Sequence, residues 1–280
     1  IFSYSCSMLI YPEINPVIFS FGPLKVHWYG LMYLLGFFFA WRIALSRSKS
    51  SKSPVCQNQV EDLIIYSAFG VILGGRFGYV LFYNFEEWLA DPLWLFRIWE
   101  GGMSFHGGLL GVLFVIWIFS RKINKPFLAL ADFVAPLVPI GLGLGRLGNF
   151  MGQELWGRPT SSWTGMIFPN DPQKLTRHPS QLYEFFLEGL LLYIVLITVS
   201  RKPRSTGFIG GLFLTLYGSF RFFVEFYRAP DVTIGFDFFG WMTRGQLLSL
   251  PMIIIGIIII LWSYSITNQI NKSIEERSKN

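Results

Sequence analysis

Seven runs of mostly apolar residues divide this 280-residue chain, and each approaches the roughly 20 residues that a helix needs to cross a bilayer. The pattern predicts an all-α polytopic membrane protein with seven transmembrane helices, forming a single integral membrane domain over residues 1–280. The predicted spans cover about residues 26–45, 63–83, 104–120, 127–147, 182–200, 208–227 and 247–264.

Charges in the connections predict the orientation. Basic residues follow the first, third and fifth runs and occupy the C-terminal tail, whereas the loops after the second and sixth runs carry Glu or Asp. Basic loops stay cytoplasmic, so the N-terminus is expected outside and the C-terminus inside, which agrees with an odd number of spans. The long connection over about residues 149–180 then lies outside. Its tryptophans and prolines predict an ordered cap at the membrane interface.

Composition supports a membrane protein and excludes other classes. Hydrophobic residues make up 52% of the chain and charged residues 14%, against the ~25% charged residues of soluble domains. The net charge of +6 is spread over the loops, so it indicates topology and not nucleic-acid binding. Two cysteines do not make a disulfide framework. Residues 1–7 precede Met8 without a signal-peptide pattern, and an extension ahead of the natural start is one interpretation of them.

Ionisable residues inside the apolar runs are candidates for function. A charge at the bilayer centre costs at least ~2.5–3.5 kcal/mol, so several of these side chains must share a polar interior. The residues within or at the head of the runs are Arg76, His106, Asp132, Arg146, Glu184, Glu188, Arg221 and Glu225. For Arg76 and Asp132, a purely structural role is the alternative interpretation.

Arg146 lies in the glycine-rich stretch GLGLGRLGNF, where small residues allow close approach of a backbone or a ligand. The planar donor fork of arginine suits a phosphate. The alternative is an ion pair between helices, with Asp132 or Glu154 as the partner. Both interpretations stay open from the residues alone.

Arg221 and Glu225 are four residues apart, so a local ion pair is the simplest interpretation. Tyr217 shares their helix face, which indicates a polar wall. His106 could act as a base near neutral pH or could cap the start of its span. His178 precedes a proline and is interpreted first as helix-entry chemistry, with a catalytic alternative.

Several familiar catalytic motifs are missing from the sequence. It contains no GxSxG serine motif, no HExxH motif and no Walker A motif, which argues against a serine protease, a zinc protease and an ATP-driven pump. We therefore expect recognition of a phosphate headgroup without a metal. A transporter or flippase for an anionic lipid or solute would use the same arginines, and a seven-helix receptor is a third alternative.

Six motifs, in order along most of the chain, resemble those of the prolipoprotein diacylglyceryl transferase family. They are HWYGLMY (His27–Tyr33), GGRFGYV (Gly74–Val80), GGMSFHGG (Gly101–Gly108), GRLGNFMGQELWGRPT (Gly145–Thr160), HPSQLYE (His178–Glu184) and YGSFRFFVEFYRAPD (Tyr217–Asp231).

The resemblance implies an activity in the bacterial cytoplasmic membrane, with the chemistry toward the outer leaflet. Family members transfer the diacylglyceryl group of phosphatidylglycerol to the lipobox cysteine thiol of a preprolipoprotein. A thioether forms, glycerol 1-phosphate leaves, and no cofactor is needed. The partners are therefore phosphatidylglycerol, the lipobox segment and the bilayer.

The resemblance also implies site residues. Arg146 and Arg221 match the family's two key arginines, for headgroup binding and leaving-group stabilisation, and His106 matches a histidine proposed as the base. The other matching positions, expected to bind substrate, are Tyr29, Asn149, Glu154, Gly157, Tyr217 and Glu225. One departure from the pattern is Gly152, where the family usually has asparagine; a polar contact to the lipid or to the loop is therefore either missing or made by Gln153.

Overall fold

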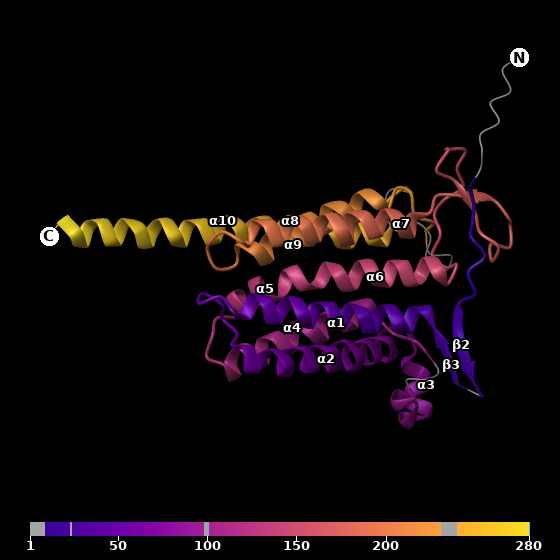
Figure 1. Cartoon of the computed structure of the whole chain (residues 1–280), viewed down its shortest axis with the longest axis horizontal. Helices are drawn as coiled ribbons and strands as arrows, with labels where there is room; N and C mark the ends of the chain where they lie inside the picture. The colour runs from indigo at the N-terminus through magenta and orange to yellow at the C-terminus, as the bar shows by residue number, and fades with distance from the viewer. Residues whose placement is uncertain (1–8, 23, 98–100, 231–239, 280) are drawn as a thin grey trace, which may run out of the picture. The chain divides into compact units, whose positions relative to one another are not determined.

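The computed structural model describes residues 9–22, 24–97, 101–230 and 240–279, and it is mostly helical (Figure 1). Residues 1–7 and the acidic loop with Asp231 and Asp237 lie outside the described residues. The helical segments are α1 (Trp28–Ser48), α2 (Gln57–Tyr83), α3 (Phe85–Ala90), η1 (Pro92–Phe96), α4 (Phe105–Lys122), α5 (Phe127–Val134), η3 (Ala135–Leu137), α6 (Val138–Met151), α7 (Ser180–Glu184), η4 (Phe185–Leu191), α8 (Leu192–Val199), α9 (Phe208–Val224) and α10 (Arg244–Lys279).

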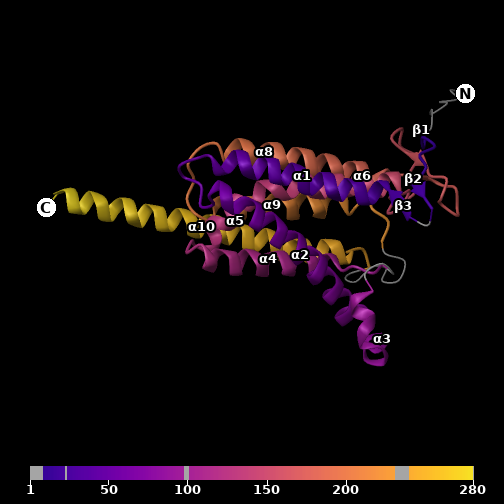
Figure 2. The same ribbon diagram turned by 60° about the horizontal axis from the view of Figure 1, so that its bottom comes forward.

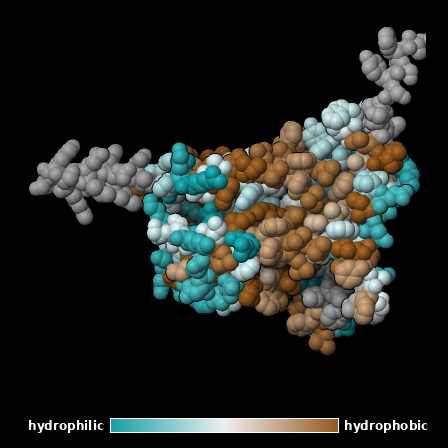
Figure 3. Space-filling view, viewed as in Figure 1, coloured by the Kyte–Doolittle hydropathy of each residue, from teal (hydrophilic) through white to brown (hydrophobic). Residues whose placement is uncertain are grey.

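Five helical stretches of the described chain are long and apolar enough to cross a membrane. They are Trp28–Ser48, Gln57–Leu81, Phe127–Met151, Ser180–Val199 and Arg244–Ile266, and the apolar helix α9 is shorter. The face drawn in Figure 3 is hydrophobic along the middle of the helices and hydrophilic toward their ends. These features agree with the prediction of a helical membrane protein.

The chain divides into two compact units, one formed by residues 40–134 and the other by residues 1–39 and 135–280. In the first unit, α2 and α4 run side by side in both ribbon views (Figure 1, Figure 2). Their contact follows a ladder of glycines, Gly70, Gly74 and Gly78 on α2 and Gly107 and Gly111 on α4. A Cβ atom on Gly74 would lie 2.8 Å from the Cα of Gly111, and one on Gly78 would lie 2.6 Å from the Cα of Gly107. Only glycine permits this backbone approach, which is a common way to pack helices in membranes.

Arg76, on α2 in the same unit, is buried and bonded to backbone carbonyls. Its Nε donates to Leu95 O at 3.0 Å, Nη2 to Trp94 O at 2.7 Å and Nη1 to Gly101 O at 2.5 Å. The guanidinium also lies 4.5 Å from the Trp94 ring centroid. These contacts satisfy the buried charge locally, so the structure gives Arg76 a structural role in holding η1 and Gly101 against α2.

In the second unit, the helices are interrupted where the sequence predicts continuous spans. Pro136 lies in the 3₁₀ segment η3 between α5 and α6, and Pro139 lies in the first turn of α6, where the missing backbone donor of proline is tolerated. The segment η4 is a π-helix that joins α7 to α8. Leu192, Leu196, Ile209 and Tyr217 form a buried core with Ala135.

The chain is mostly helical, as predicted, and short strands lie in the N-terminal segment and in the long connection. Strand β2 (Val17–Phe21) pairs antiparallel with β3 (Leu24–His27). Val26 and His27, which the predicted first span includes, therefore belong to a hairpin. Strand pairing satisfies their backbone groups before α1 begins, and α10 also extends beyond its predicted end.

The connection between α6 and α7 is ordered, as the prolines and aromatic residues predict. Strand β4 (Met166–Ile167) pairs with β5 (Thr176–Arg177) and with β1 (Leu9–Ile10). Tyr11 packs with Phe150 and Phe168, and its hydroxyl donates to Phe150 O at 2.9 Å. The buried Gln153 accepts from the Asn170 amide at 3.1 Å, which agrees with the alternative in which Gln153 makes a polar contact to the loop.

Asp171 forms the main ion pair of this connection. Both of its carboxylate oxygens accept from Arg177, at 2.6 and 3.2 Å, and the side chain of Asp171 is 1% exposed. The hydrogen bond from Arg177 holds the pKa of Asp171 below its usual value, and backbone N–H groups of Gln173 and Leu175 act in the same direction.

Asp171→Asn is expected to lower the free energy of unfolding at neutral pH by about 1.5–3 kcal/mol, the contribution of a hydrogen bond to a charged group. Because the folded-state pKa is lowered, the difference from wild type should persist above about pH 4 and shrink as the pH falls further. Thermal unfolding across this pH range measures it. Asp91→Asn is the control, since the Asp91–Arg97 pair is 43% and 40% exposed and should contribute under about 1 kcal/mol. Equal effects of the two substitutions would refute the prediction.

Candidate functional site

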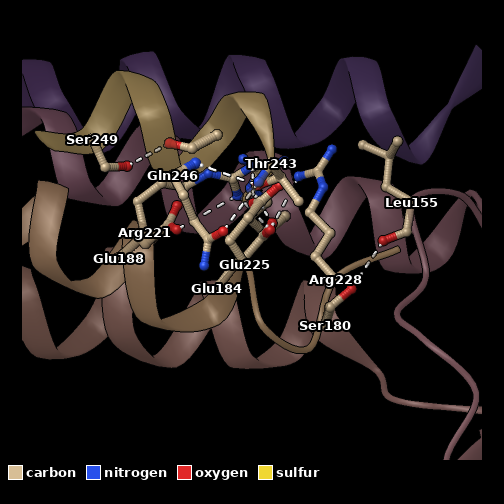
Figure 4. A network of polar contacts seen from close by, with 12 residues as sticks. Leu155, Ser180, Glu184, Glu188, Arg221, Glu225, Arg228, Thr243, Gln246 and Ser249 are labelled. Atoms are coloured by element: carbon tan, nitrogen blue, oxygen red, sulfur yellow. Dashed lines mark hydrogen bonds and ion pairs between the residues drawn. The ribbon is translucent and has the colours of Figure 1, made fainter. Parts of the chain in front are cut away.

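Three arginines converge on one buried carboxylate, that of Glu184 at the end of α7 (Figure 4). Arg146 Nε lies 2.6 Å from Glu184 Oε2, while Arg221 Nη1 and Arg228 Nη1 lie 2.6 and 3.1 Å from Oε1. We call these four residues, with Glu188 and Glu225, the arginine network. It joins α6, the α7–η4 segment and α9 within one compact unit.

Local sequence explains how α6 and η4 come close enough to share these charges. A Cβ atom on Gly189 would lie 2.7 Å from the Cα of Gly143, so the two backbones touch. The π-helical turn then carries Glu188 one turn beyond Glu184, and such turns often occur at functional sites.

Arg221 has carboxylates on two sides. Its Nη2 lies 2.9 Å from Glu225 Oε2, which confirms the predicted local pair, and its Nη1 lies 3.7 Å from Glu188 Oε1. Glu225 is wedged against α10, because a Cβ atom on Gly245 would lie 2.7 Å from the carboxylate carbon. Three arginines and three glutamates make the network formally neutral when all six are ionised.

Asn149 connects Arg146 to the connection that follows α6. Its amide nitrogen donates to Glu154 Oε1 at 2.7 Å, and its amide oxygen lies 3.5 Å from Arg146 Nη1. The carbonyl of Glu154 accepts from Gln181 Nε2 at 2.6 Å. Two predicted binding residues, Asn149 and Glu154, therefore hold Arg146 and the start of α7 together.

Gly157 lies where two backbone segments meet. Its amide donates to His178 O at 2.8 Å, and a Cβ atom would lie 2.6 Å from that same oxygen. The structure thus explains glycine at this position by close packing. Next to it, Arg158 donates to the carbonyl of Arg228 at 2.8 Å, which ties this segment to the end of the network.

His178 makes structural contacts of the kind predicted for a helix entry. Its Nδ1 lies 3.1 Å from the Tyr183 hydroxyl, and its ring meets Tyr227 edge-on at 5.1 Å. Burial lowers the pKa of His178, which favours a neutral imidazole.

The two tyrosines that are predicted to bind substrate, Tyr29 and Tyr217, have different environments. Tyr217 is buried on α9, one turn before Arg221, and stacks on Phe213 at 5.7 Å. Tyr29 is 42% exposed, and its hydroxyl lies 3.1 Å from that of Tyr33. Its ring contacts Gly148 on α6, so it belongs to the same unit as the network.

His106 belongs to the other unit, in the first turn of α4, and its side chain lies outside the described residues. The structure brings together Arg146, Asn149, Glu154, Tyr217, Arg221 and Glu225 through contacts within one unit. Whether His106 reaches them stays a prediction.

For Arg146, the structure shows the ion pair between helices that was one of the two interpretations, but the partner is Glu184 and not Asp132 or Glu154. The sequence analysis counted Glu184 and Glu188 among the charges inside the apolar runs but gave them no role in the site, and it did not single out Arg228. A signal existed for Glu184 and Arg228, since both belong to motifs of the resemblance, and Glu184 is a carboxylate inside an apolar run.

The arrangement suits binding of an anion. Glu184 is 2% exposed at its side chain, whereas Arg146, Arg221 and Arg228 are 18%, 14% and 12% exposed. The described contacts of Arg146 use Nε and Nη1, so Nη2 keeps donor capacity for an incoming group. Fixed guanidinium donors of this kind stabilise developing phosphate charge. Among the described residues, no cluster of His, Cys, Asp and Glu could hold a metal.

Comparison with known sequences gives one consistent family. Residues 16–262 match the family described as prolipoprotein diacylglyceryl transferase. A protein of Teredinibacter turnerae is 58% identical over 92% of this chain and 93% of its own length. Proteins of Coxiella burnetii and Azotobacter vinelandii are 58% and 55% identical over 92% of this chain, and 98% and 97% of their own lengths are covered. All three are named phosphatidylglycerol–prolipoprotein diacylglyceryl transferase.

Proposed function

Because this chain belongs to the prolipoprotein diacylglyceryl transferase family, we propose how its arginine network serves the reaction that this family performs. The protein is a transferase that moves the diacylglyceryl group of phosphatidylglycerol to a prolipoprotein. The observation that supports the site is the convergence of Arg146, Arg221 and Arg228 on the single buried carboxylate of Glu184.

The acceptor is the thiol of a lipobox cysteine. Its sulfur forms a bond to the carbon of the diacylglyceryl group that carries the phosphate, and the bond from that carbon to the phosphate oxygen breaks. The electron pair of the broken bond stays on the phosphate, which leaves as glycerol 1-phosphate. Charge therefore develops on a phosphate oxygen, and guanidinium groups held in advance stabilise that charge.

Arg146 and Arg221 bind the lipid phosphate and stabilise the leaving group. Glu225 and Asn149 orient the two guanidinium groups, and Glu154 holds Asn149. Tyr217 and Tyr29 line the lipid-binding space, while Gly157 keeps the connection close to the start of α7.

The thiol needs to lose its proton. Thiols titrate near 8.5, so a base or a positive field raises the fraction of thiolate at neutral pH. His106 is the candidate for the base, and the guanidinium groups, which are more exposed than the Glu184 carboxylate, supply a local positive potential.

His106→Asn separates these two sources. If the imidazole is the base, transfer should fall about 10²-fold or more, and raising the pH toward 8.5 should restore part of the rate as the thiol ionises by itself. The initial rate of glycerol phosphate release, measured at several pH values, tests this expectation. If the variant keeps wild-type rates at every pH, the imidazole is not the base, and the positive potential of the arginines is sufficient to ionise the thiol.

The proposed topology has seven spans, with the N-terminus outside and the active site toward the outer leaflet of the bacterial cytoplasmic membrane. Helices in all seven predicted segments support this arrangement, as do the basic residues between α1 and α2, between α4 and α5 and between α8 and α9. The connection from α6 to α7 then lies where an exported lipobox cysteine arrives.

One assay tests the proposed function as a whole. Purified protein with phosphatidylglycerol should release glycerol phosphate only when a lipobox peptide is present, and the peptide should gain the mass of diacylglycerol. A peptide with serine in place of the lipobox cysteine is the control. Headgroup binding without release would instead indicate the transporter that shares the same arginines.

A further inference from the structure

A second place for an anion lies in residues 40–134, at the turn between α4 and α5. A pocket of about 320 Å³ opens there, with polar lining from Ser120, Arg121, Asn124 and Lys125 and apolar lining from Trp117 and Phe127. This volume is at the lower end of the range for small-molecule sites. None of these residues belongs to the arginine network.

The pocket has a fixed frame. The Lys125 amide donates to Ser120 O at 3.0 Å, the Asn124 amide donates to Arg121 O at 3.2 Å, and Asn124 takes a left-handed backbone with φ of 52°. The hydroxyl of Ser120 donates to Trp117 O at 2.7 Å. These bonds fix the backbone of the turn, and with it the positions from which Arg121 and Lys125 project.

The two cations of the pocket are available for a ligand. The neighbouring Lys122 is engaged, because its Nζ lies 3.0 Å from Asp62 and 3.3 Å from the Tyr66 hydroxyl. Within the described part of this unit, by contrast, neither Arg121 nor Lys125 lies within ion-pair distance of a carboxylate. Arg121 instead lies 5.8 Å from the Trp117 ring centroid, a geometry that keeps its donors open to an anion.

We propose that this pocket binds the phosphate headgroup of an anionic lipid, through Arg121 and Lys125. Trp117 is 46% exposed and, with Phe127, gives the pocket an apolar side suited to the boundary between headgroups and acyl chains. A wholly soluble anion would not need that side. Basic pockets between membrane helices recognise lipid headgroups in this way. The proposal rests on the membrane placement given above, which puts the turn at the inner leaflet, and not on the transfer reaction.

The full-length protein in detergent micelles, with a photoreactive phosphatidic acid as the probe, tests the proposal. Cross-links should map to the segment 117–127. Arg121→Gln/Lys125→Gln should weaken this labelling about 20- to 30-fold, since each basic residue near a lipid surface contributes about fivefold. Arg201→Gln/Lys202→Gln removes two charges from the exposed turn after α8 and is the matched control, which should label like wild type.

Three results would overturn the proposal: unchanged labelling in the Arg121/Lys125 variant, equal labelling by a photoreactive phosphatidylcholine, or full displacement by millimolar inorganic phosphate. The last result would assign the pocket to a free anion. If the Arg121/Lys125 variant still releases glycerol phosphate, it is folded. If wild-type protein is labelled as expected but shows no transfer, the proposed function fails and the pocket proposal stands. Should the double variant not fold, raising the ionic strength on wild type must still weaken the labelling.

Discussion

Glu184→Gln is expected to abolish diacylglyceryl transfer and to lower the free energy of unfolding by about 3–5 kcal/mol, the usual cost of breaking a buried ion pair. Among the described residues, Glu184 is the one carboxylate that contacts all three of Arg146, Arg221 and Arg228, each within 3.1 Å. Without its charge, the three guanidinium groups repel one another and lose their common orientation. Glycerol phosphate release and thermal unfolding in the same detergent measure the two effects.

Glu188→Gln is the matched control for this experiment. Glu188 is equally buried on the next turn, but its carboxylate only approaches Arg221 at 3.7 Å and has no hydrogen bond among the described residues. Its neutralisation should cost much less activity and stability than that of Glu184. Equal losses in the two variants would mean that total charge, and not the geometry at Glu184, organises the network.

Arg146→Ala and Arg221→Ala should each lower the rate of transfer by at least about 10²–10³-fold, the loss seen when a preorganised donor to a developing oxyanion is removed. Either variant leaves Glu184 with two arginine partners, so the fold should survive better than in Glu184→Gln. Lysine should not restore the rate at either position, because it lacks the planar fork that bridges two acceptors.

Rates of glycerol phosphate release at saturating phosphatidylglycerol test the arginine prediction, with Arg204→Ala at an exposed turn as the control. Thermal unfolding of each variant separates loss of chemistry from loss of fold. Wild-type rates in both Arg146→Ala and Arg221→Ala would remove these residues from the site.

The free-energy cost of placing a charge inside an apolar span was enough to identify much of the polar site from the sequence. Arg146, Arg221 and Glu225 stood out because charges within apolar runs are expensive, and the spacing of Arg221 and Glu225 predicted a pair that the structure confirms at 2.9 Å. Local spacing is sufficient for such a pair, since both residues lie on one helix.

The partner of Arg146 was not predictable in the same way. Choosing Glu184 requires knowing which faces of α6 and α7 meet, and this depends on the contact of Gly143 with Gly189 between residues far apart in sequence. Asp132 could have been excluded by distance, because at ~1.5 Å per residue a helix places it about 21 Å from Arg146. The carboxylate of Glu154 accepts a hydrogen bond from Asn149 instead.

Hydropathy predicted where the helices are, but not how the first one begins. Val26 and His27 continue an apolar stretch, yet they belong to strand β3 and pair with the neighbouring strand β2. A hydropathy window averages over about twenty positions and contains no information on strand pairing, so a hairpin that leads directly into a helix is read as part of that helix.

The glycine ladder between α2 and α4 constrains how this protein can evolve. Gly74 and Gly111 approach so closely that no side chain fits at either position, and every missense change of a glycine codon introduces one. A second mutation on the facing helix cannot compensate, because the obstacle is backbone and not a side chain that could be made smaller. These positions should therefore be nearly invariant under mutational drift, even though none of them takes part in the chemistry.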